Sequence, residues 1–504
     1  MFFILMFLNI SAKHKVTKFN RNDHRKLFQT LKTNFDSIFS SYTPENFFQL
    51  FMENYNKKYS SEEETKYRFN QIKENAERIY HFNKKHNDLK LGITPFIDMS
   101  FNEFKYFYLM DEETTSYLQN KATKRRREQD AIISGNHKEN KIIFPRYDSR
   151  MLQGFPNMTS IRDSIFSSFT SPFQQDQQSS SFMTAPTTTN WFQTPDTSSF
   201  NSNQDTSTTQ SDYNTNTRNE QSDNTQTTAT LSDDDQTSTK TGDNQTRYRR
   251  GGFSYPKRVF KDFMEAHKLI NKRRYNISDY ARYINWTEAR KVTPVRDQKR
   301  CASCYAFSAI ANIESLSLIH QNMEYNLSEQ EIIDCSYDYY NEGCKGGLQA
   351  FTIDYIMDNG ITAEKNYPYA DQEQRCYKNR RNRIYYDKLD YIYLDNNVMA
   401  LIAALNYGPA TMAFIATPDF FRYNRGVIDE SVCNTDIKTP NHSTLVVGYD
   451  LDAKVPHFIV KNSWSSDWGE DGYFRIKIGS LSTNNTGLCG LASFDINTMG
   501  IIVE

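Results

Sequence analysis

The sequence predicts a chain of the α+β class, with a helical N-terminal part and a C-terminal part that combines helices with a sheet. Apolar residues recur at helical spacing between residues 43 and 110, which predicts amphipathic helices. All seven cysteines lie after residue 300, which indicates one oxidised folding unit over residues 280–504. Within that unit an apolar helical run follows Cys304, and strand-like apolar runs occur near the C-terminus.

The start of the chain is apolar but short. Residues 1–10 are too few for a membrane span, which takes about 20 apolar residues. We expect residues 1–12 to be a signal peptide, although the usual basic start is missing, and an apolar stub is the other interpretation. No other stretch predicts a membrane span. The formal net charge of -1 gives no global field that would draw the chain to nucleic acid or anionic lipid.

Residues 43–110 are predicted to contain two amphipathic helices. The stretch "TPENFFQLFMENYNKKY" places Phe47, Phe51 and Tyr55 at helical spacing, and residues 61–87 carry a similar apolar stripe. Two such helices bury little apolar surface by themselves. They therefore need a partner surface elsewhere in the chain.

Residues 111–250 differ from both neighbours in composition. The run "KRRREQD" (124–130) is interpreted as solvated charge, and residues 164–246 are dominated by Ser, Thr, Asn, Gln and Asp. Such a segment buries too little apolar area to offset its ordering entropy, so we expect a disordered linker. A glycosylated stalk is the alternative, because Asn244 begins a glycosylation sequon.

Cys301 and Cys304 form a C-x-x-C pair, which is compatible with a redox couple, half of a metal site or two thiols with unrelated roles. Cys304 lies at the start of the predicted helix, where the helix dipole lowers the pKa of a thiol. A free cysteine is nevertheless more often a small buried hydrophobic residue. Because the number of cysteines is odd, at least one of them is unpaired.

Two polar residues near the C-terminus supply the other groups that a nucleophilic thiol needs. His442 precedes the strand-like run 445–447, and Asn462 ends the run 458–461. A thiol needs a base, and the base needs a group that fixes its ring. Residues of such a triad are distant in sequence and are assembled by the fold. A single histidine is more often structural, so spacing alone leaves this role open.

Five blocks of the C-terminal part closely resemble the papain family of cysteine peptidases, in that family's order: "PVRDQKRCASCYAFSA", "LSEQEIIDC", "GCKGG", "NHSTLVVGYD" and "VKNSWSSDWGEDGYFRIK". The resemblance implies a papain-like fold of two subdomains over residues 280–504, one helical and one an antiparallel, barrel-like sheet. Residues 43–110 resemble the inhibitory prodomain of the cathepsin L-like branch, with Thr94 in place of the usual Asn. The matching motif residues are Glu64, Arg68, Ile72, Asn75, Ile79, Asn83, Gly92, Phe96 and Asp98.

The resemblance implies an answer for the cysteine pair. It pairs Cys301 with Cys344, Cys335 with Cys376, and Cys433 with Cys489, and it leaves Cys304 as the nucleophile. A zinc site would need two further ligands at short spacing, and no metal is expected. A thioredoxin-type pair would need a βαβ setting in a reducing compartment.

The catalytic roles also follow from the resemblance. His442 is the partner base of Cys304, Asn462 orients the imidazole, and Trp464 covers that contact. Gln298 and the Cys304 backbone N–H form the oxyanion hole. A non-enzymatic peptide-binding module of the same fold is the rival interpretation, and the presence of all four catalytic groups argues against it.

The substrate site implied by the resemblance is apolar. Gly346 and Gly347 allow a peptide to pair with the backbone. The pocket for the second residue before the scissile bond is lined by Leu348, Ala413, Ser443 and Phe494, so we expect a hydrophobic preference in an endopeptidase. The chain departs from the family pattern at three positions, none of them catalytic: Ala302, Tyr305 and Ser465.

The resemblance further implies an inactive precursor. Residues 251–279 would be the end of the propeptide, and cleavage within 274–281 would release an enzyme that starts near Tyr280. Acid release is expected, with Glu64 and Asp98 as candidate sensors. We expect a monomeric enzyme of the secretory pathway, lysosomal or extracellular, with protein or peptide substrates and cystatin-like inhibitors as partners. The most plausible glycan acceptors are Asn285, Asn326 and Asn484.

Overall fold

The computed structural model describes residues 42–134, 265–272, 274–377, 382–386, 388–433 and 438–502. The predicted signal peptide, most of the predicted linker and residues 251–264 lie outside these ranges. No helix among the described residues is long and apolar enough to cross a membrane.

The two predicted N-terminal helices are present as α3 (Pro44–Asn54) and α4 (Glu62–Lys85). Helix α3 begins with a proline at a position that has no helical N–H to lose, and Thr43 caps it. Helix α4 has three glutamates in its first turn and two lysines in its last turn, which suits the helix dipole. Its buried face includes Ile72, Ile79 and Phe82.

A short strand, β1 (Lys90–Leu91), leads to helix α5 (Phe101–Tyr108), whose first turn is closed by a capping box of Ser100 and Glu103. Next comes α6 (Glu112–Ile133), where the sequence was expected to start a disordered linker. That boundary was wrong, because two of its arginines and two of its apolar residues contact the C-terminal part and supply the stabilisation that composition alone did not predict.

The C-terminal part is built around a central helix, α9, which starts at Cys304 and whose residues are all buried. The other α-helices and strands of the helical half are α10 (Glu329–Cys335), α11 (Gln349–Asn359), β3 (Ile361–Thr362) and β4 (Arg383–Ile384), whereas α12 (Val398–Leu405) packs on the sheet, against β6 and β9. Short helical turns occur throughout the C-terminal part: η2 (Ile277–Asp279), η3 (Ser317–Gln321), η4 (Tyr337–Tyr339), η5 (Gly343–Lys345), η6 (Glu364–Asn366), η7 (Phe420–Arg422) and η8 (Leu488–Gly490). Helix α9 itself spans Cys304–Leu316.

The main sheet has eight strands, in the order β5-β12-β6-β9-β10-β11-β8, with β2 paired to β9. Its strands are β2 (Tyr283–Asn285), β5 (Leu389–Tyr393), β6 (Ala410–Phe414), β8 (Val427–Ile428), β9 (His442–Asp450), β10 (His457–Lys461), β11 (Tyr473–Lys477) and β12 (Thr498–Ile502). All its pairs are antiparallel except β11 with β8. The α+β class is confirmed, but the described strands do not close into a barrel.

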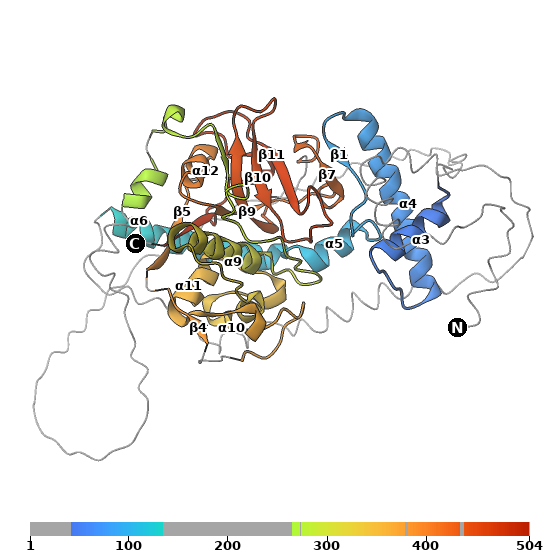
Figure 1. Cartoon of the computed structure of the whole chain (residues 1–504), viewed down its shortest axis with the longest axis horizontal. Coiled ribbons are helices and arrows are strands. Elements are labelled where there is room, and N and C mark those ends of the chain that lie inside the picture. Colours follow the sequence, from blue (N-terminus) through green and yellow to red (C-terminus); the bar gives the residue numbers. More distant parts are fainter. Residues whose placement is uncertain are drawn as a thin grey trace, which may run out of the picture. The chain divides into compact units, whose positions relative to one another are not determined.

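The two halves meet at α9, which packs against β9 on one side and α11 on the other. Figure 1 shows α5 and α6 running along this boundary. The N-terminal helices share core clusters with both halves: Phe96 and Phe104 with the sheet side, and Leu118 with the helical side. The partner surface that the N-terminal helices needed is therefore the C-terminal part itself.

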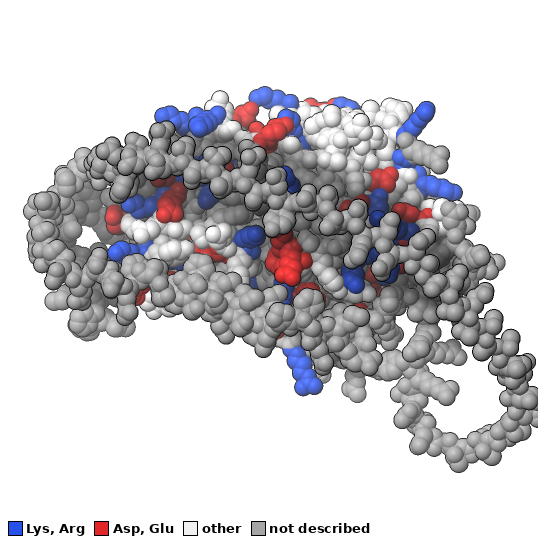
Figure 2. Space-filling model, turned by 180° about the vertical axis from the view of Figure 1, so that it is seen from behind, with Lys and Arg blue, Asp and Glu red and all other residues white. Residues whose placement is uncertain are grey.

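Charged side chains are mixed on the face seen in Figure 2, where Lys and Arg alternate with Asp and Glu over the described residues. This agrees with the net charge of -1. The basic residues 124–127 of α6 are a local feature, and two of them, Arg125 and Arg126, form ion pairs with acidic residues that are described below.

Candidate active site

Cys304 is the first residue of α9 and is the one free cysteine of the seven, all of which are described. Its side chain is fully buried. Ser303 makes no side-chain cap to the helix, so the N–H groups of the first turn remain directed at this position.

The other six cysteines form three disulfides. Cys301 is bonded to Cys344, which leaves the second sulfur of the C-x-x-C pair alone. The remaining bonds join Cys335 to Cys376 and Cys433 to Cys489. These are the pairs that the family resemblance implied, and a redox couple of Cys301 with Cys304 is absent. Among the described residues no group of His, Cys, Asp and Glu is arranged to hold a metal ion.

His442 is the first residue of β9, and Asn462 follows the end of the neighbouring strand β10. The antiparallel pairing of these strands brings the two residues together, with His442 Nε2 2.8 Å from Asn462 Oδ1. Trp464 stacks on the imidazole at 4.4 Å between ring centroids, and both rings are fully buried. The Nδ1 atom of His442 has no hydrogen-bond partner, so it is the nitrogen left for a reacting group.

The thiol and the imidazole sit on facing elements, because α9 packs against β9. Ser443, the residue after His442, lies beside the Cys304 thiol, and its hydroxyl has no hydrogen-bond partner. Burial raises the pKa of Cys304 to about 12, against a smaller lowering effect of the polar groups of Ser443 and of the first turn of α9. Burial also lowers the pKa of His442 to about 4, against the opposing effect of Asn462. In this closed form the two groups are therefore a neutral thiol and a neutral imidazole.

Gln298 is fully buried beside Cys304 and has its amide fixed at both ends. Ser463 Oγ donates to Gln298 Oε1 at 2.7 Å, which directs Nε2 towards the cleft. Nε2 donates to the backbone oxygens of Cys301, at 2.9 Å, and of Tyr108, at 3.0 Å. The carbonyl of Tyr108, in the N-terminal segment, thus occupies the donor that an oxyanion would need. Sequence reasoning missed both Ser463 and Tyr108, since neither carries a signal of its own.

The residues after Tyr108 continue along the glycines of the cleft. The backbone N–H of Met110 donates to the carbonyl of Asn441 at 2.8 Å. A methyl group on Gly346 would lie 3.2 Å from Met110 Cβ, and one on Gly347 would lie 2.5 Å from the ring of Tyr305. Both glycines are therefore required by close packing, the first against the N-terminal segment and the second against α9.

The predicted pocket residues come from separate elements. Leu348 is the residue just before α11. Ala413 and Ser443 are opposite each other in the β6–β9 pair. All three are buried, and Phe494 is partly buried against the same core cluster as Leu348 and Ala413. Three of these four side chains are apolar, and the fourth is the hydroxyl of Ser443.

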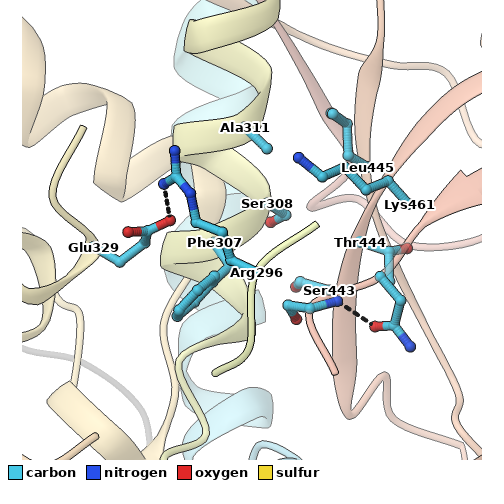
Figure 3. Close-up of a pocket in the computed structure, with 11 residues that line it drawn as sticks. Arg296, Phe307, Ser308, Ala311, Glu329, Ser443, Thr444, Leu445 and Lys461 are labelled. Carbon is cyan, nitrogen blue, oxygen red and sulfur yellow. Dashed lines mark hydrogen bonds and ion pairs between the residues drawn. The ribbon is translucent and has the colours of Figure 1, made fainter. Parts of the chain in front are cut away.

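Charged side chains line a pocket beside α9, with Arg296 and Glu329 on its helical side and Lys461 on its sheet side (Figure 3). Arg296 forms ion pairs with Glu329 and, at 2.5 Å, with Glu314 of α9. Lys461 Nζ donates to the backbone oxygen of Thr293 at 2.8 Å. Burial raises the pKa of Glu329 to about 7 and lowers that of Lys461 to about 8. This charged cluster links β10, which ends just before Asn462, to α9, which starts at Cys304. Sequence reasoning did not identify it.

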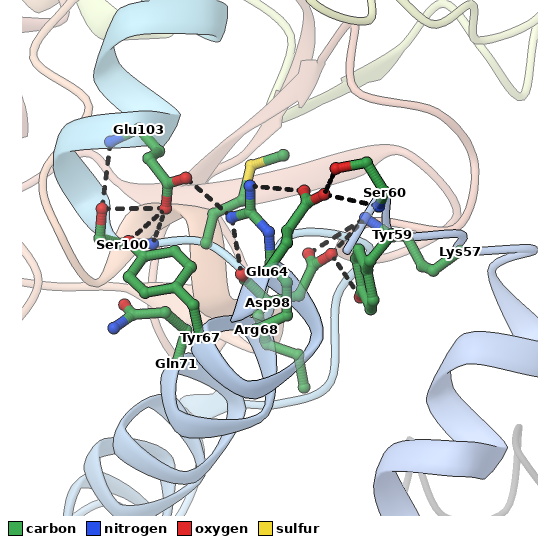
Figure 4. Close-up of polar contacts among 12 residues, drawn as sticks. Lys57, Tyr59, Ser60, Glu64, Tyr67, Arg68, Gln71, Asp98, Ser100 and Glu103 are labelled. Carbon is green, nitrogen blue, oxygen red and sulfur yellow. Dashed lines mark hydrogen bonds and ion pairs between the residues drawn. The ribbon is translucent and has the colours of Figure 1, made fainter. Parts of the chain in front are cut away.

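The predicted prodomain motif forms a polar cluster within the N-terminal segment (Figure 4). Arg68 bonds Glu103 at 2.8 Å and lies 3.5 Å from Glu64, and its Nη1 also donates to the backbone oxygen of Asp98. The Asp98 carboxylate accepts from Lys57 and from Tyr59, each at 3.0 Å. These bonds join α4 to α5 and to the loop between them.

Other motif residues contact the C-terminal part directly. Asn75 donates to the carbonyls of Ile97 and Met99, and its Oδ1 accepts from Arg422 at 2.7 Å. Gly92 donates from its backbone to the Arg422 carbonyl, and β1 pairs with β7 (Tyr423–Arg425). Ile72 and Ile79 are core residues. The ring centroids of Phe96 and Trp464 are 6.1 Å apart. The side-chain amide of Asn83 donates to the carbonyl of Leu91 and accepts from its backbone N–H. Phe104 of α5 also packs edge-on to Trp464, at 4.9 Å.

Comparison with known proteins agrees with this geometry. Residues 280–498 match the model of the papain family cysteine protease, and residues 48–104 match that of the cathepsin propeptide inhibitor domain. Mexicain of Jacaratia mexicana is 36% identical over 42% of this chain and 94% of its own length. Mouse pro-cathepsin H is 36% identical over 43% of this chain, and the match spans 65% of its length. The structure of digestive procathepsin L 3 of Tenebrio molitor superposes with a TM-score of 0.52 at 20% identity, over 92% of this chain and all of that one, which shows a shared fold.

Proposed function

Because the chain belongs to the papain family of cysteine peptidases, we propose that it is a cysteine endopeptidase made as an inactive precursor. The observation that carries this proposal is the free thiol of Cys304 at the start of α9, opposite the bonded pair of His442 and Asn462. The hydrogen bond from Gln298 to the carbonyl of Tyr108 also supports the proposal, because Gln298 is the proposed oxyanion donor.

The reaction starts when the prodomain leaves and the cleft fills with water and substrate. The thiol then transfers its proton to Nδ1 of His442, and the thiolate attacks the peptide carbonyl carbon. A carbon–sulfur bond forms and the amide bond breaks as the imidazolium protonates the leaving amine. Water hydrolyses the resulting thioester, which releases the acid and restores the Cys304 thiol.

Four groups assist without forming bonds to the substrate carbon. Asn462 holds the imidazole in the orientation that presents Nδ1, and Trp464 excludes water from that hydrogen bond. Gln298 and the backbone N–H of Cys304 donate to the oxyanion, and one such donor is typically worth about 3–4 kcal/mol of transition-state stabilisation.

Specificity is proposed to rest on an apolar pocket. Gly346 and Gly347 give the substrate backbone close access, and Leu348, Ala413, Ser443 and Phe494 receive the second side chain before the scissile bond. Burial of Leu348 and Ala413 supports a hydrophobic preference there. Phe494 shortens the pocket, so branched aliphatic side chains should fit better than large aromatic ones.

Activation is proposed to occur by cleavage within residues 274–281 at acidic pH. The three disulfides support folding in the secretory pathway, with a lysosomal or extracellular destination. A monomeric mature enzyme that binds cystatin-like inhibitors completes the proposal, with Asn285, Asn326 and Asn484 as glycan acceptors.

The test is to acidify the purified precursor and treat it with an epoxide or iodoacetamide. Peptide mass spectrometry locates the label, and hydrolysis of a peptide with leucine two residues before the scissile bond is followed in parallel. Label on Cys304 with matching loss of hydrolysis supports the proposal. Label on Cys304 without any turnover before labelling would instead indicate a peptide-binding module.

A further inference from the structure

Helix α6 lies outside the matched propeptide domain, which ends at residue 104, yet it is bound tightly to the C-terminal part. Arg125 donates to Asp354 of α11 at 2.5 Å and to the Tyr391 hydroxyl of β5 at 3.0 Å. Its side chain is 18% exposed. A charge buried to this degree requires paired and specific partners, and here one carboxylate and one hydroxyl supply them.

The next residue, Arg126, has a different set of partners. It donates to the backbone oxygen of Leu394 at 2.8 Å and forms ion pairs with Asp395 at 3.1 Å and Asp495 at 3.3 Å. Together the two arginines contact three carboxylates of the C-terminal part. Arg127, the third arginine in the row, is exposed.

The remaining contacts of α6 lie on the same face of the helix. Leu118 and Ala122 are fully buried in the core of the helical half. Gln129 donates to the backbone oxygen of Tyr391 and accepts from the N–H of Tyr393, on the strand that ends the main sheet. The contact residues of α6 follow helical spacing, at positions 118, 122, 125, 126 and 129. The face of α6 that they form is therefore apolar in the first half of the helix and basic in the second.

We propose that this surface is a separate binding site for a basic amphipathic helix, with α6 as its resident ligand. The site, which we call the α6 site, consists of Asp354, Tyr391, Tyr393, Asp395 and Asp495. The chain enters it directly from the cleft, because Met110 and Asp111 contact Asn441 and Lys345 just before α6 begins. Removal of the N-terminal segment would leave three carboxylates and an open strand edge beside the cleft, ready to accept a helix of the same chemistry in trans.

This inference goes beyond the proposed hydrolysis and is tested without it. The full-length chain with Cys304→Ala, which lacks the nucleophile, is compared with the same chain carrying R125A and R126A, and with a control carrying R127A. Amide hydrogen exchange is measured over residues 389–395. We expect the double variant to exchange roughly tenfold faster or more, because two charge-assisted contacts are lost, and the R127A chain to behave like the parent.

A synthetic peptide of residues 112–133 is then added in excess to the double variant. We expect the peptide, and its R127A form, to restore slow exchange over residues 389–395, and the R125A/R126A peptide to have no effect. Unchanged exchange in the double variant would overturn the proposal, as would failure of the wild-type peptide to restore protection. Protection of α4 in every variant shows that the chains are folded. None of these outcomes depends on whether the enzyme cleaves peptides.

Discussion

The side-chain amide of Gln298 donates a 3.0 Å hydrogen bond to the backbone carbonyl of Tyr108, a residue 190 positions earlier in the chain. The N-terminal segment therefore uses the same donor that the proposed reaction needs for its oxyanion. A carbonyl held there while Cys304 is a neutral thiol gives a closed form in which the catalytic groups are present but unable to react. Inhibition in this chain thus has two causes. The segment around Tyr108 occupies the Gln298 donor, and burial keeps the Cys304 thiol protonated.

Replacement of Gln298 by alanine should lower the kcat of the processed enzyme by about 10²–10³-fold, because one of the two oxyanion donors is lost. KM should change little, since the donor acts mainly on the transition state. Steady-state hydrolysis of a short peptide measures both constants. Gln321→Ala, at an exposed position at the end of η3, is the matched control. A Gln298→Ala enzyme with unchanged kcat would remove Gln298 from the mechanism.

Alkylation of Cys304 in the precursor should be at least about 100-fold slower at pH 7 than in the processed enzyme. Burial raises the pKa of this thiol to about 12, so the reactive thiolate is scarce, and the segment around Tyr108 also blocks access. Iodoacetamide labelling followed over time measures the two rates. Because all other cysteines are in disulfides, the unfolded, unreduced chain should take up one label rapidly. Equal rates in precursor and processed enzyme would contradict the closed form described above.

Acid should open the precursor through His442. Its pKa is about 4 in the closed form, against an ordinary value of 6.5 once the imidazole is solvated. Above pH 6.5 both forms hold a neutral ring, so the closed form has its full stability. As the pH falls from 6.5 to 4, only the open form takes up the proton, which favours opening by up to about 3 kcal/mol.

Hydrogen exchange of residues 105–111 against pH, in the Cys304→Ala chain, measures this opening. His442→Gln should remove most of the dependence between pH 6.5 and 4. His81→Gln, on α4 with a side chain that is 58% exposed, should leave it in place. The same pH profile in the His442→Gln chain would assign the response to other groups.

The sequence predicted the family of this chain and the disulfide pairs better than its boundaries. Cys304 lies at the start of a helix, His442 at the start of a strand, and Asn462 just after the end of one. Neighbouring residues determine such element ends, so they can be predicted locally. The partners of Gln298 could not be predicted, since Tyr108 and Ser463 reach it only through tertiary packing. Helix α6 was missed for a related reason: a run of charges was interpreted as solvated, while Arg125 and Arg126 are bound by aspartates more than 200 positions away.

Asp98 and Glu64 were both expected to sense acid, and their surroundings in the structure differ. Although partial burial opposes it, hydrogen bonds from Ser60 and the pair with Arg68 lower the pKa of Glu64 below its ordinary 4.5. The stability that Glu64 contributes is therefore present above pH 4.5 and is lost only below it. Glu64→Gln should leave the pH dependence of opening between pH 6.5 and 5 unchanged, as measured by exchange of residues 105–111.

Asp98→Asn should weaken the prodomain at pH 7. The Asp98 carboxylate is 3% exposed and accepts from Lys57 and Tyr59, so an amide in its place leaves the ammonium of Lys57 without its counter-charge. We expect the prodomain to lose about 1–3 kcal/mol of stability. This is at the lower end of the cost of breaking a buried ion pair, because the side chain of Lys57 is 20% exposed. Opening at pH 7 should then be roughly tenfold faster or more. Glu63→Gln, at an exposed position in the first turn of α4, is the matched control. If the Asp98→Asn precursor opened at the parent rate, the cluster around Arg68 would be holding α4 and α5 together without this ion pair.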